Sequence, residues 1–475
     1  TPLARNRKKK PGSERERSRP STSLRSASGK LSARVSRGGE VLAEAAVWAL
    51  LLLVWWYHDR GAKDAFRLPK LVLSQGLVLV SLFFLSFRLQ VVPQVRAGIL
   101  RRLPAVRAAL PLVAVAGLSL LTTAYPYQGR EAWISLLIGA AALVGWSIGF
   151  SEAARNRLLG GILLPAGALS VVGILQYHDV YRPFDFSGQV EAQRLGVTSF
   201  AGSAGDLAVM LVLPCLIAQH RLLTRRGLER LLWGVGLALC LYCLAVTQTL
   251  TCILALVAGS LLFWLWVLPW RRAVAVMALV AVVTGVLVVT VAPLRERVTI
   301  KARQLSRGSL NSVLTGRLDG WQAALWMFRQ HPLLGVGQGA YRTEFADAKL
   351  ALLEEGREFL GSQTQVMFVN AHNEPLEVLA ETGVLGAAAL LWGLWVLLRV
   401  TRRRMPRRSA RKEGADGPDP PSGGSADSAL AWSGLAALLL LSLGQFPFRL
   451  ALTGYPAVLF LAWLLGGMEG EEDPS

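Results

Sequence analysis

Long apolar runs separated by short polar stretches dominate this chain. The runs are about 17 to 22 residues long, close to the roughly 20 residues that a helix needs to cross a bilayer core. Unpaired backbone is too costly in lipid for irregular structure, so these runs predict transmembrane helices and an all-α polytopic membrane protein. Twelve spans are predicted, at about 41–57, 70–87, 109–125, 132–150, 158–176, 200–218, 230–246, 251–269, 273–291, 383–400, 429–445 and 451–467.

Arginines collect in every second loop, after the second, fourth, sixth, eighth and tenth spans. The positive-inside rule therefore places these loops and both termini in the cytoplasm. The predicted organisation is a disordered basic tail (1–38), nine spans (39–291), one large external loop (292–382), three spans (383–467) and a cytoplasmic tail (468–475). A flexible cytoplasmic linker is predicted at 401–428, within the last group of spans.

Composition agrees with a membrane protein, since 53% of the residues are hydrophobic and only 17% are charged. The net charge of +20 resides mainly in the N-terminal tail and the short loops, which argues against nucleic acid as a partner. Cys215, Cys240, Cys243 and Cys252 all fall inside apolar runs. These cysteines are predicted to pack as small apolar residues rather than to bind zinc or form disulfides.

The large external loop is predicted to be helical. Apolar residues recur at helical spacing between Thr315, a candidate N-cap, and Pro332, which follows the helix end. A second amphipathic stripe runs from Tyr341 to Leu352. This stripe suits a helix on the membrane surface and equally one that packs against the bundle. The glycine-rich segment Gly335–Gly339 is predicted to be a tight turn that lets backbone approach closely, rather than a phosphate loop.

The segment 370–386 ends this loop and places a histidine where the chain re-enters the membrane. Pro375 suits the first turn of a helix, so Asn373 or Glu374 is expected to cap it. Helical spacing then puts three carboxylates on one face: Glu374, Glu377 and Glu381.

His372 precedes this helix and has two possible roles. A neutral imidazole can take a proton from an acceptor hydroxyl, with Glu377 as the neighbour that orients the ring. A capping or packing histidine fits the sequence as well. A metal site is not expected, because the pattern around His372 lacks the spacing of zinc ligands.

Three external arginines are candidates for binding phosphate: Arg194, Arg317 and Arg329. A guanidinium suits bidentate contact with phosphate oxygens. Arginines near the interface can equally bind lipid head groups.

Two segments, TGRLDGWQAALWMFRQHPLLGVGQGAY and HNEPLEVLAETGVLG, follow each other within about 315–386. With the twelve-span pattern and one large late loop, they resemble the O-antigen ligase and polymerase superfamily. The resemblance implies a bacterial inner-membrane glycosyltransferase with its active site facing the periplasm. Its substrates would be an undecaprenyl-diphosphate-linked glycan donor and a glycan or glycolipid acceptor, among membrane lipids and without cofactor.

The resemblance also assigns roles to residues. His372 matches the family histidine and Arg317 the arginine before the Trp-containing helix, while Asn373, Glu374 and Glu381 would support the site. The implied reaction is an inverting displacement in which Arg317, with Arg194 and Arg329, holds the departing diphosphate. One departure stands out: Leu250 occupies the place of an arginine at the mouth between the seventh and eighth spans.

Other functions fit parts of the sequence. A polymerase of lipid-linked repeat units would use the same residues as a ligase. An inactive homologue would account for Leu250. A transporter or flippase is disfavoured, because the spans carry few charges and show no internal repeat.

Overall fold

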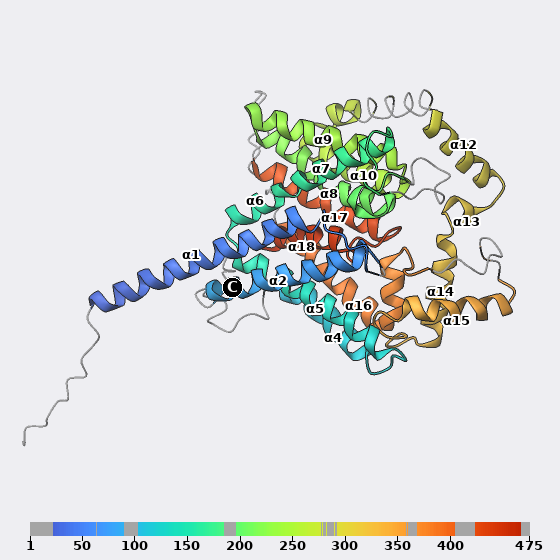
Figure 1. Ribbon diagram of the computed structural model, residues 1–475, viewed down its shortest axis with the longest axis horizontal. Helices are drawn as coiled ribbons and strands as arrows, with labels where there is room; N and C mark the ends of the chain where they lie inside the picture. The colour runs from blue at the N-terminus through green and yellow to red at the C-terminus, as the bar shows by residue number, and fades with distance from the viewer. Residues whose placement is uncertain are drawn as a thin grey trace, which may run out of the picture.

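The computed structural model describes residues 22–62, 64–89, 103–184, 196–276, 278, 282, 289, 292–357, 359, 368–403 and 423–466. All regular elements in this part of the chain are helices (Figure 1). In chain order they are α1 (Thr22–Leu53), α2 (Arg67–Leu89), α4 (Pro104–Ser119), α5 (Pro126–Gly149), α6 (Glu152–Gly161), α7 (Leu163–Tyr177), η3 (Ser199–Ala201), α8 (Ala204–Thr224), α9 (Gly227–Thr247), α10 (Leu250–Val267), α12 (Ala292–Ser306), α13 (Leu310–Val313), α14 (Arg317–Gln330), α15 (Tyr341–Glu354), α16 (Glu374–Arg403), α17 (Gly423–Ser442) and α18 (Ala451–Leu465).

Eight helical segments among the described residues are long and apolar enough to cross a membrane: α2, α5, α6 with α7, α8, α9, α10, α16 and α17. Helices α4 and α18 are apolar but shorter. The all-α membrane class is therefore confirmed, while the number twelve stays a prediction. The first predicted span coincides largely with the second half of α1, and the ninth, 273–291, falls mostly outside the described residues.

Two segments predicted to be flexible are helical at their ends. Helix α1 begins at Thr22, so the prediction of disorder over 1–38 was wrong for residues 22–38. Extending a helix is far less costly than nucleating one, so the apolar part of α1 supports this polar extension. Likewise α16 continues to Arg403 and α17 begins at Gly423, which leaves 404–422 of the predicted linker outside the described residues.

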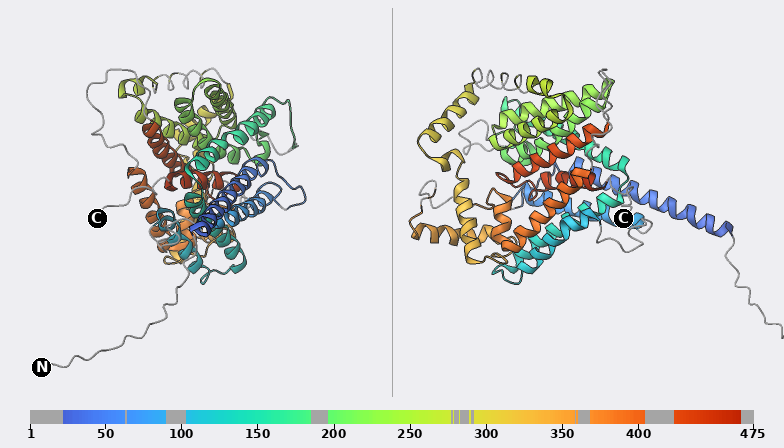
Figure 2. Two further views of the ribbon diagram at one scale, coloured as in Figure 1. Left: turned by 90° about the vertical axis from the view of Figure 1, so that its left-hand side faces the viewer. Right: turned by 180° about the vertical axis from the view of Figure 1, so that it is seen from behind.

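Helix α8 lies at the centre of the bundle, and every residue from Asp206 to Arg221 is buried. It packs against α9, α17 and α10, while α2 packs along α1 and α4 along α16. Helices α12 to α15 gather at one end of the bundle, and the first half of α1 projects from the opposite end (Figures 1 and 2). The end that carries α12 to α15 is called the loop end below.

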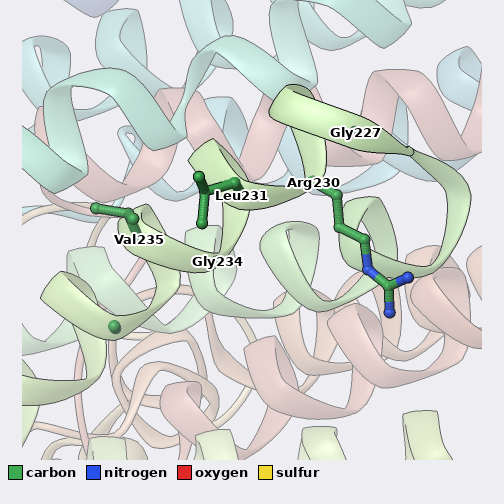
Figure 3. Close-up of a pocket in the computed structure, with 6 residues that line it drawn as sticks. Gly227, Arg230, Leu231, Gly234 and Val235 are labelled. Carbon is green, nitrogen blue, oxygen red and sulfur yellow. The ribbon is translucent and has the colours of Figure 1, made fainter.

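A groove of about 500 Å³ lies on the outer flank of α9, lined by Gly227, Arg230, Leu231, Gly234, Val235 and Ala238 (Figure 3). The glycines and the alanine leave space beside the helix, while Leu231 and Val235 flank it. None of the residues expected to carry chemistry lines this groove. The candidate site is therefore sought at the loop end, where His372 lies.

Candidate functional site

His372 lies in the short connection that leads into α16, and the next residue caps that helix. Asn373 Oδ1 accepts a hydrogen bond from the Leu376 N–H at 3.1 Å, and the Asn373 carbonyl accepts one from the Glu377 N–H at 2.9 Å. Pro375 occupies the first turn, where its missing N–H leaves no helical hydrogen bond unmade. The cap fixes where the helix starts and so holds His372 just outside it.

The carboxylates of α16 are buried and engaged. Glu374 accepts hydrogen bonds from the Ser442 hydroxyl at 2.9 Å and from the Phe448 N–H at 2.8 Å. Glu381 accepts one from Arg449 Nη2 at 2.8 Å. Glu374 therefore ties α16 to the end of α17, and both carboxylates tie it to the turn between α17 and α18.

Glu377 does not orient His372, contrary to the role considered from the sequence. Its carboxylate accepts hydrogen bonds from Asn370 Nδ2 and from the Ala371 N–H, each at 2.9 Å, and pairs with Arg449 Nη1 at 3.0 Å. These contacts fold the connection back over the start of α16. Both Glu377 oxygens are thereby occupied, and no hydrogen bond joins them to His372 in the described structure.

Arg449 neutralises the two buried carboxylates. Its guanidinium bridges Glu377 and Glu381 and keeps 23% of the side-chain surface exposed. Burial disfavours the charged form, but Glu377 and Glu381 outweigh that effect and raise the pKa of Arg449. The bridge holds the α17–α18 turn against the first turns of α16, which follow His372.

The His372 ring is held between two aromatic side chains. Its backbone is left-handed, with φ of 52°. The ring centroid lies 5.9 Å from that of Phe368 and 5.0 Å from that of Phe446. Nδ1 is enclosed by protein and has no hydrogen-bond partner. Buried polar atoms are normally paired, so this nitrogen is available to a ligand.

His372 is uncharged at neutral pH. Burial is the largest cause and lowers its pKa to about 4, and the positive charges of Arg317 and Arg67 act in the same direction. A hydrogen bond with the side chain of Gln445 has the opposite effect and raises the pKa, but it is the smallest of these contributions. A neutral ring can accept a proton or a hydrogen bond, which a protonated ring cannot do.

Arg317 begins α14 and is largely buried. Its Nη1 donates to the Leu314 carbonyl at 3.3 Å and to the Thr315 hydroxyl at 3.1 Å, while Nε has no partner. Burial lowers its pKa, with a small opposite contribution from Cys252 in the first turn of α10. The charge of Arg317 is therefore felt both by His372 and by Cys252 near the start of α10.

Arg67 enters the site from the start of α2. It forms a bidentate pair with Asp206 at the start of α8, with Nε–Oδ2 at 3.0 Å and Nη2–Oδ1 at 3.2 Å. Its guanidinium lies 5.6 Å from the centroid of Phe446, the ring that also contacts His372. Its side chain is 40% exposed, so it can bind a ligand without leaving Asp206.

Several helices begin at this point. The starts of α2, α8, α14 and α16 are connected by the interactions of four residues: Arg67, Asp206, Arg317 and His372. The positive ends of helix dipoles favour anions, and so do Arg67 and Arg317. Among the described residues no cluster of His, Cys, Asp and Glu could hold a metal ion. The arrangement can bind an anion beside a neutral imidazole.

The structure separates the three arginines expected to bind phosphate. Arg317 is near enough to His372 for its charge to lower the pKa of that ring. Arg329 is exposed in the last turn of α14, about 18 Å along the helix axis from Arg317 at 1.5 Å per residue. It is therefore not part of this arrangement. Arg194 lies outside the described residues.

The segment Gly335–Gly339 supports α16 from the other side. Helix α16 breaks at Gly383, and the N–H groups of Val336 and Gly337 donate to the carbonyls of Ala380 and Glu381 at 3.0 and 2.9 Å. Gly335, Gly337 and Gly339 all have positive φ and pack closely on neighbouring residues. The prediction of a tight turn with close backbone approach is confirmed.

Substituting Gly335 should destabilise the protein strongly. An alanine Cβ would lie 2.3 Å from the Glu381 carbonyl carbon, at a φ of 68°. Steric conflict and left-handed strain together predict a loss of about 3 kcal/mol for Gly335→Ala. Gly308→Ala is the matched control, because Gly308 has φ of 71° with nothing nearby, and it should lose only about 1 kcal/mol. Thermal unfolding of purified protein would compare them; equal losses would contradict the packing argument.

Sequence reasoning missed Arg67, Gln445 and Arg449. Arg67 and Arg449 lie in short connections between apolar runs, where an arginine was read as part of a loop. The available signal was that both connections are external in the predicted topology, where the positive-inside rule does not call for arginine. Gln445 offered a weaker signal, as a polar residue at the end of an apolar span.

Comparison with known proteins identifies part of the chain. No curated protein matches it. Residues 235–391 match a family model described as O-Antigen ligase. This segment runs from within α9 to within α16 and includes Leu250, Arg317 and His372, whereas Arg67 and Arg449 lie outside it. Over residues 235–391, the chain is similar to the O-antigen ligase family.

Proposed function

We propose that the protein is a glycosyltransferase that moves a glycan from an undecaprenyl-diphosphate carrier to an acceptor hydroxyl. The observation that carries this proposal is the neutral His372 ring, whose pKa is lowered by the charges of the half-buried Arg317 and of Arg67. A diphosphate needs cations, and an acceptor hydroxyl needs a neutral base or hydrogen-bond acceptor. His372 and the two arginines offer both kinds of group at the loop end of the helix bundle.

In this mechanism the acceptor oxygen attacks the anomeric carbon of the donor sugar from the face opposite the diphosphate. The new carbon–oxygen bond forms as the bond to the diphosphate oxygen breaks, which inverts the anomeric centre. The electron pair leaves with the diphosphate, whose growing charge Arg317 and Arg67 stabilise. The acceptor proton passes to His372 Nδ1, so charge and atoms balance without a cofactor.

Donor binding would also strengthen His372 as a base. Arg317 and Arg67 depress the pKa of His372 in the empty site. A bound diphosphate offsets their charge, so the pKa of His372 rises in the complex. The base therefore gains strength when the donor is in place.

Arg67 can supply the positive charge that is missing at position 250. Leu250 stands at the start of α10, where it provides no charge. Arg67 reaches the same region from α2, held by Asp206, and supplies a guanidinium that is partly open to ligand. We propose that the diphosphate contact is supplied by Arg67 and Arg317 in place of an arginine at 250.

The location follows from the topology predicted by loop charge. The loop end would face the periplasm of a bacterial inner membrane, where undecaprenyl-diphosphate glycans are presented. The acceptor distinguishes a ligase, which uses lipid A-core or a similar glycolipid, from a polymerase, which uses a second lipid-linked repeat. The site chemistry is the same for both.

Transfer by purified protein would test the proposal. Wild type should move a labelled glycan from undecaprenyl diphosphate to added acceptor, assayed with lipid A-core and with a second lipid-linked unit. Arg317→Ala should lower the rate about 10² to 10³-fold, because one preorganised charge at the leaving group is lost. Arg329→Ala is the control and should retain near wild-type rates. Absence of transfer to either acceptor, or equal effects of the two variants, would contradict the proposal.

A further inference from the structure

Unpartnered polar atoms are concentrated in one external segment. Thirteen buried side-chain nitrogen or oxygen atoms lack a hydrogen-bond partner in the described part of the chain. Six of them lie between residues 297 and 322: Arg297 Nε, Gln304 Oε1, Asn311 Oδ1, Arg317 Nε, Trp321 Nε1 and Gln322 Oε1. Because buried polar groups are normally paired, such a concentration indicates a surface that a polar ligand completes.

This segment is also strongly basic. Helices α12, α13 and α14 form an arch at the loop end, residues 292–330, called the α12–α14 arch here (Figure 1). Between 292 and 322 it carries six Arg or Lys residues, at 295, 297, 301, 303, 307 and 317, against Glu296 and Asp319. Its surface therefore attracts anions.

One side of α12 is partly buried. Arg297, Lys301 and Gln304 follow helical spacing and are partly buried, whereas the other described side chains of α12 are exposed. Lys301 Nζ donates to the Ser312 carbonyl at 2.7 Å and so joins α12 to the end of α13. The inner side of α12 is thereby held in place.

The arch continues to the candidate active site. Asn311 Nδ2 donates to Asp319 Oδ1 at 2.6 Å, which joins α13 to α14 and leaves Asn311 Oδ1 unpartnered. Arg317 and Trp321 lie one turn apart on α14, so their unpartnered nitrogens share a side of that helix. Arg317 also lowers the pKa of His372 through its charge, which places it near that ring. A ligand along the arch would therefore lead to the reacting centre.

The chemistry of the unpartnered groups selects the ligand. Gln304, Asn311 and Gln322 offer carbonyl oxygens that need donors, while Arg297 and Trp321 offer N–H groups that need acceptors. Sugar hydroxyls supply both. A lipid phosphate satisfies the cations but supplies no donor for the three amide oxygens. The excess of arginine adds a preference for negative charge.

We propose that the α12–α14 arch binds an acidic glycan, one that carries carboxylate or other anionic substituents along its chain. This inference rests on the proposed function and names the substrate class of that site. The arch would hold the sugar chain while Arg317 holds the diphosphate. Acidic glycans would then be preferred over neutral glycans of the same length.

Binding of a soluble probe tests this without any transfer step. Full-length protein in detergent would be titrated with an oligogalacturonate and with a maltooligosaccharide of equal length, at low and high salt. The oligogalacturonate should bind more tightly, and high salt should weaken it. The triple variant Arg297→Gln, Arg303→Gln, Arg307→Gln should weaken oligogalacturonate binding about tenfold or more. Gln304→Leu should weaken both sugars by removing an acceptor.

Arg342→Gln is the matched control, because Arg342 is an exposed arginine on α15, outside the α12–α14 arch. This variant should bind as wild type does. Equal binding of both sugars, or no effect of the triple variant in a protein with an unchanged melting temperature, would overturn the inference. Binding to phosphatidylglycerol vesicles in place of oligogalacturonate would also overturn it and make α12 a lipid-contacting helix. Arch-dependent binding without any glycan transfer would instead count against the proposed function alone.

Discussion

Replacing His372 is expected to lower glycan transfer by about 10² to 10⁴-fold, the range for loss of a general base. The informative variant is His372→Asn. Asparagine tolerates the left-handed backbone at this position, where φ is 52°, better than alanine does. The variant should therefore keep the wild-type melting temperature while losing activity. A folded His372→Asn protein with more than half the wild-type rate would exclude His372 from the reaction.

The pH profile separates a chemical role of His372 from a structural one. Because burial and then Arg317 and Arg67 lower its pKa to about 4, the ring stays neutral above that pH and becomes protonated below it. The value of kcat/KM for wild type should therefore be level through neutral pH and fall only as pH drops toward 4. Arg67→Gln removes one repelling charge, so this acidic limb should move to higher pH, whatever the overall rate. If the acidic limb does not move, the charge of Arg67 does not lower the pKa of His372, and the prediction is wrong.

Replacing Arg449 is expected to destabilise the protein strongly. Arg449→Met leaves Glu377 and Glu381 buried at 0% and 1% exposure without their counter-charge. Removing one partner of a buried ion pair typically costs 3 to 5 kcal/mol, and because Arg449 is 23% exposed we expect about 3 kcal/mol. Thermal unfolding of the purified protein, with activity assayed in parallel, measures this loss.

Two further variants give the prediction its controls. Arg449→Lys keeps the charge but not the bidentate geometry and should lose less stability than Arg449→Met. Adding Glu377→Gln and Glu381→Gln to Arg449→Met removes the uncompensated charges and should recover part of the stability. A melting temperature of Arg449→Met equal to wild type would show that the bridge contributes nothing to the fold.

Features within one helix or one turn were largely predictable. Apolar runs placed most of the membrane helices, because span length follows from bilayer thickness. Pro375 and Asn373 predicted the start of α16, and the glycines of 335–339 predicted a close-packed turn, since both depend on local backbone geometry. Helical extension of α1 was not predictable from its polar composition, because it depends on the apolar helix that follows.

The partners of the site residues were not predictable in this way. Helical spacing correctly put the α16 carboxylates on one face, but it could not show that this face meets Arg449 instead of His372. Arg329 and Arg317 looked alike as charges, yet they lie at opposite ends of α14. Arg317 and Arg329 differ because α14 begins near His372, so that Arg317 lies at the near end of the helix and Arg329 at the far end.

The sequence by itself determined an all-α membrane protein with a long helical loop and a histidine at the loop's end, because hydrophobic period and local caps act within a few neighbouring residues. Only the tertiary structure decided which charges surround that histidine. Arg67 and Asp206 are 139 residues apart, and Arg449 and Glu381 are 68 apart. Such pairs depend on how distant helices pack, and packing is set by the whole core rather than by any local pattern.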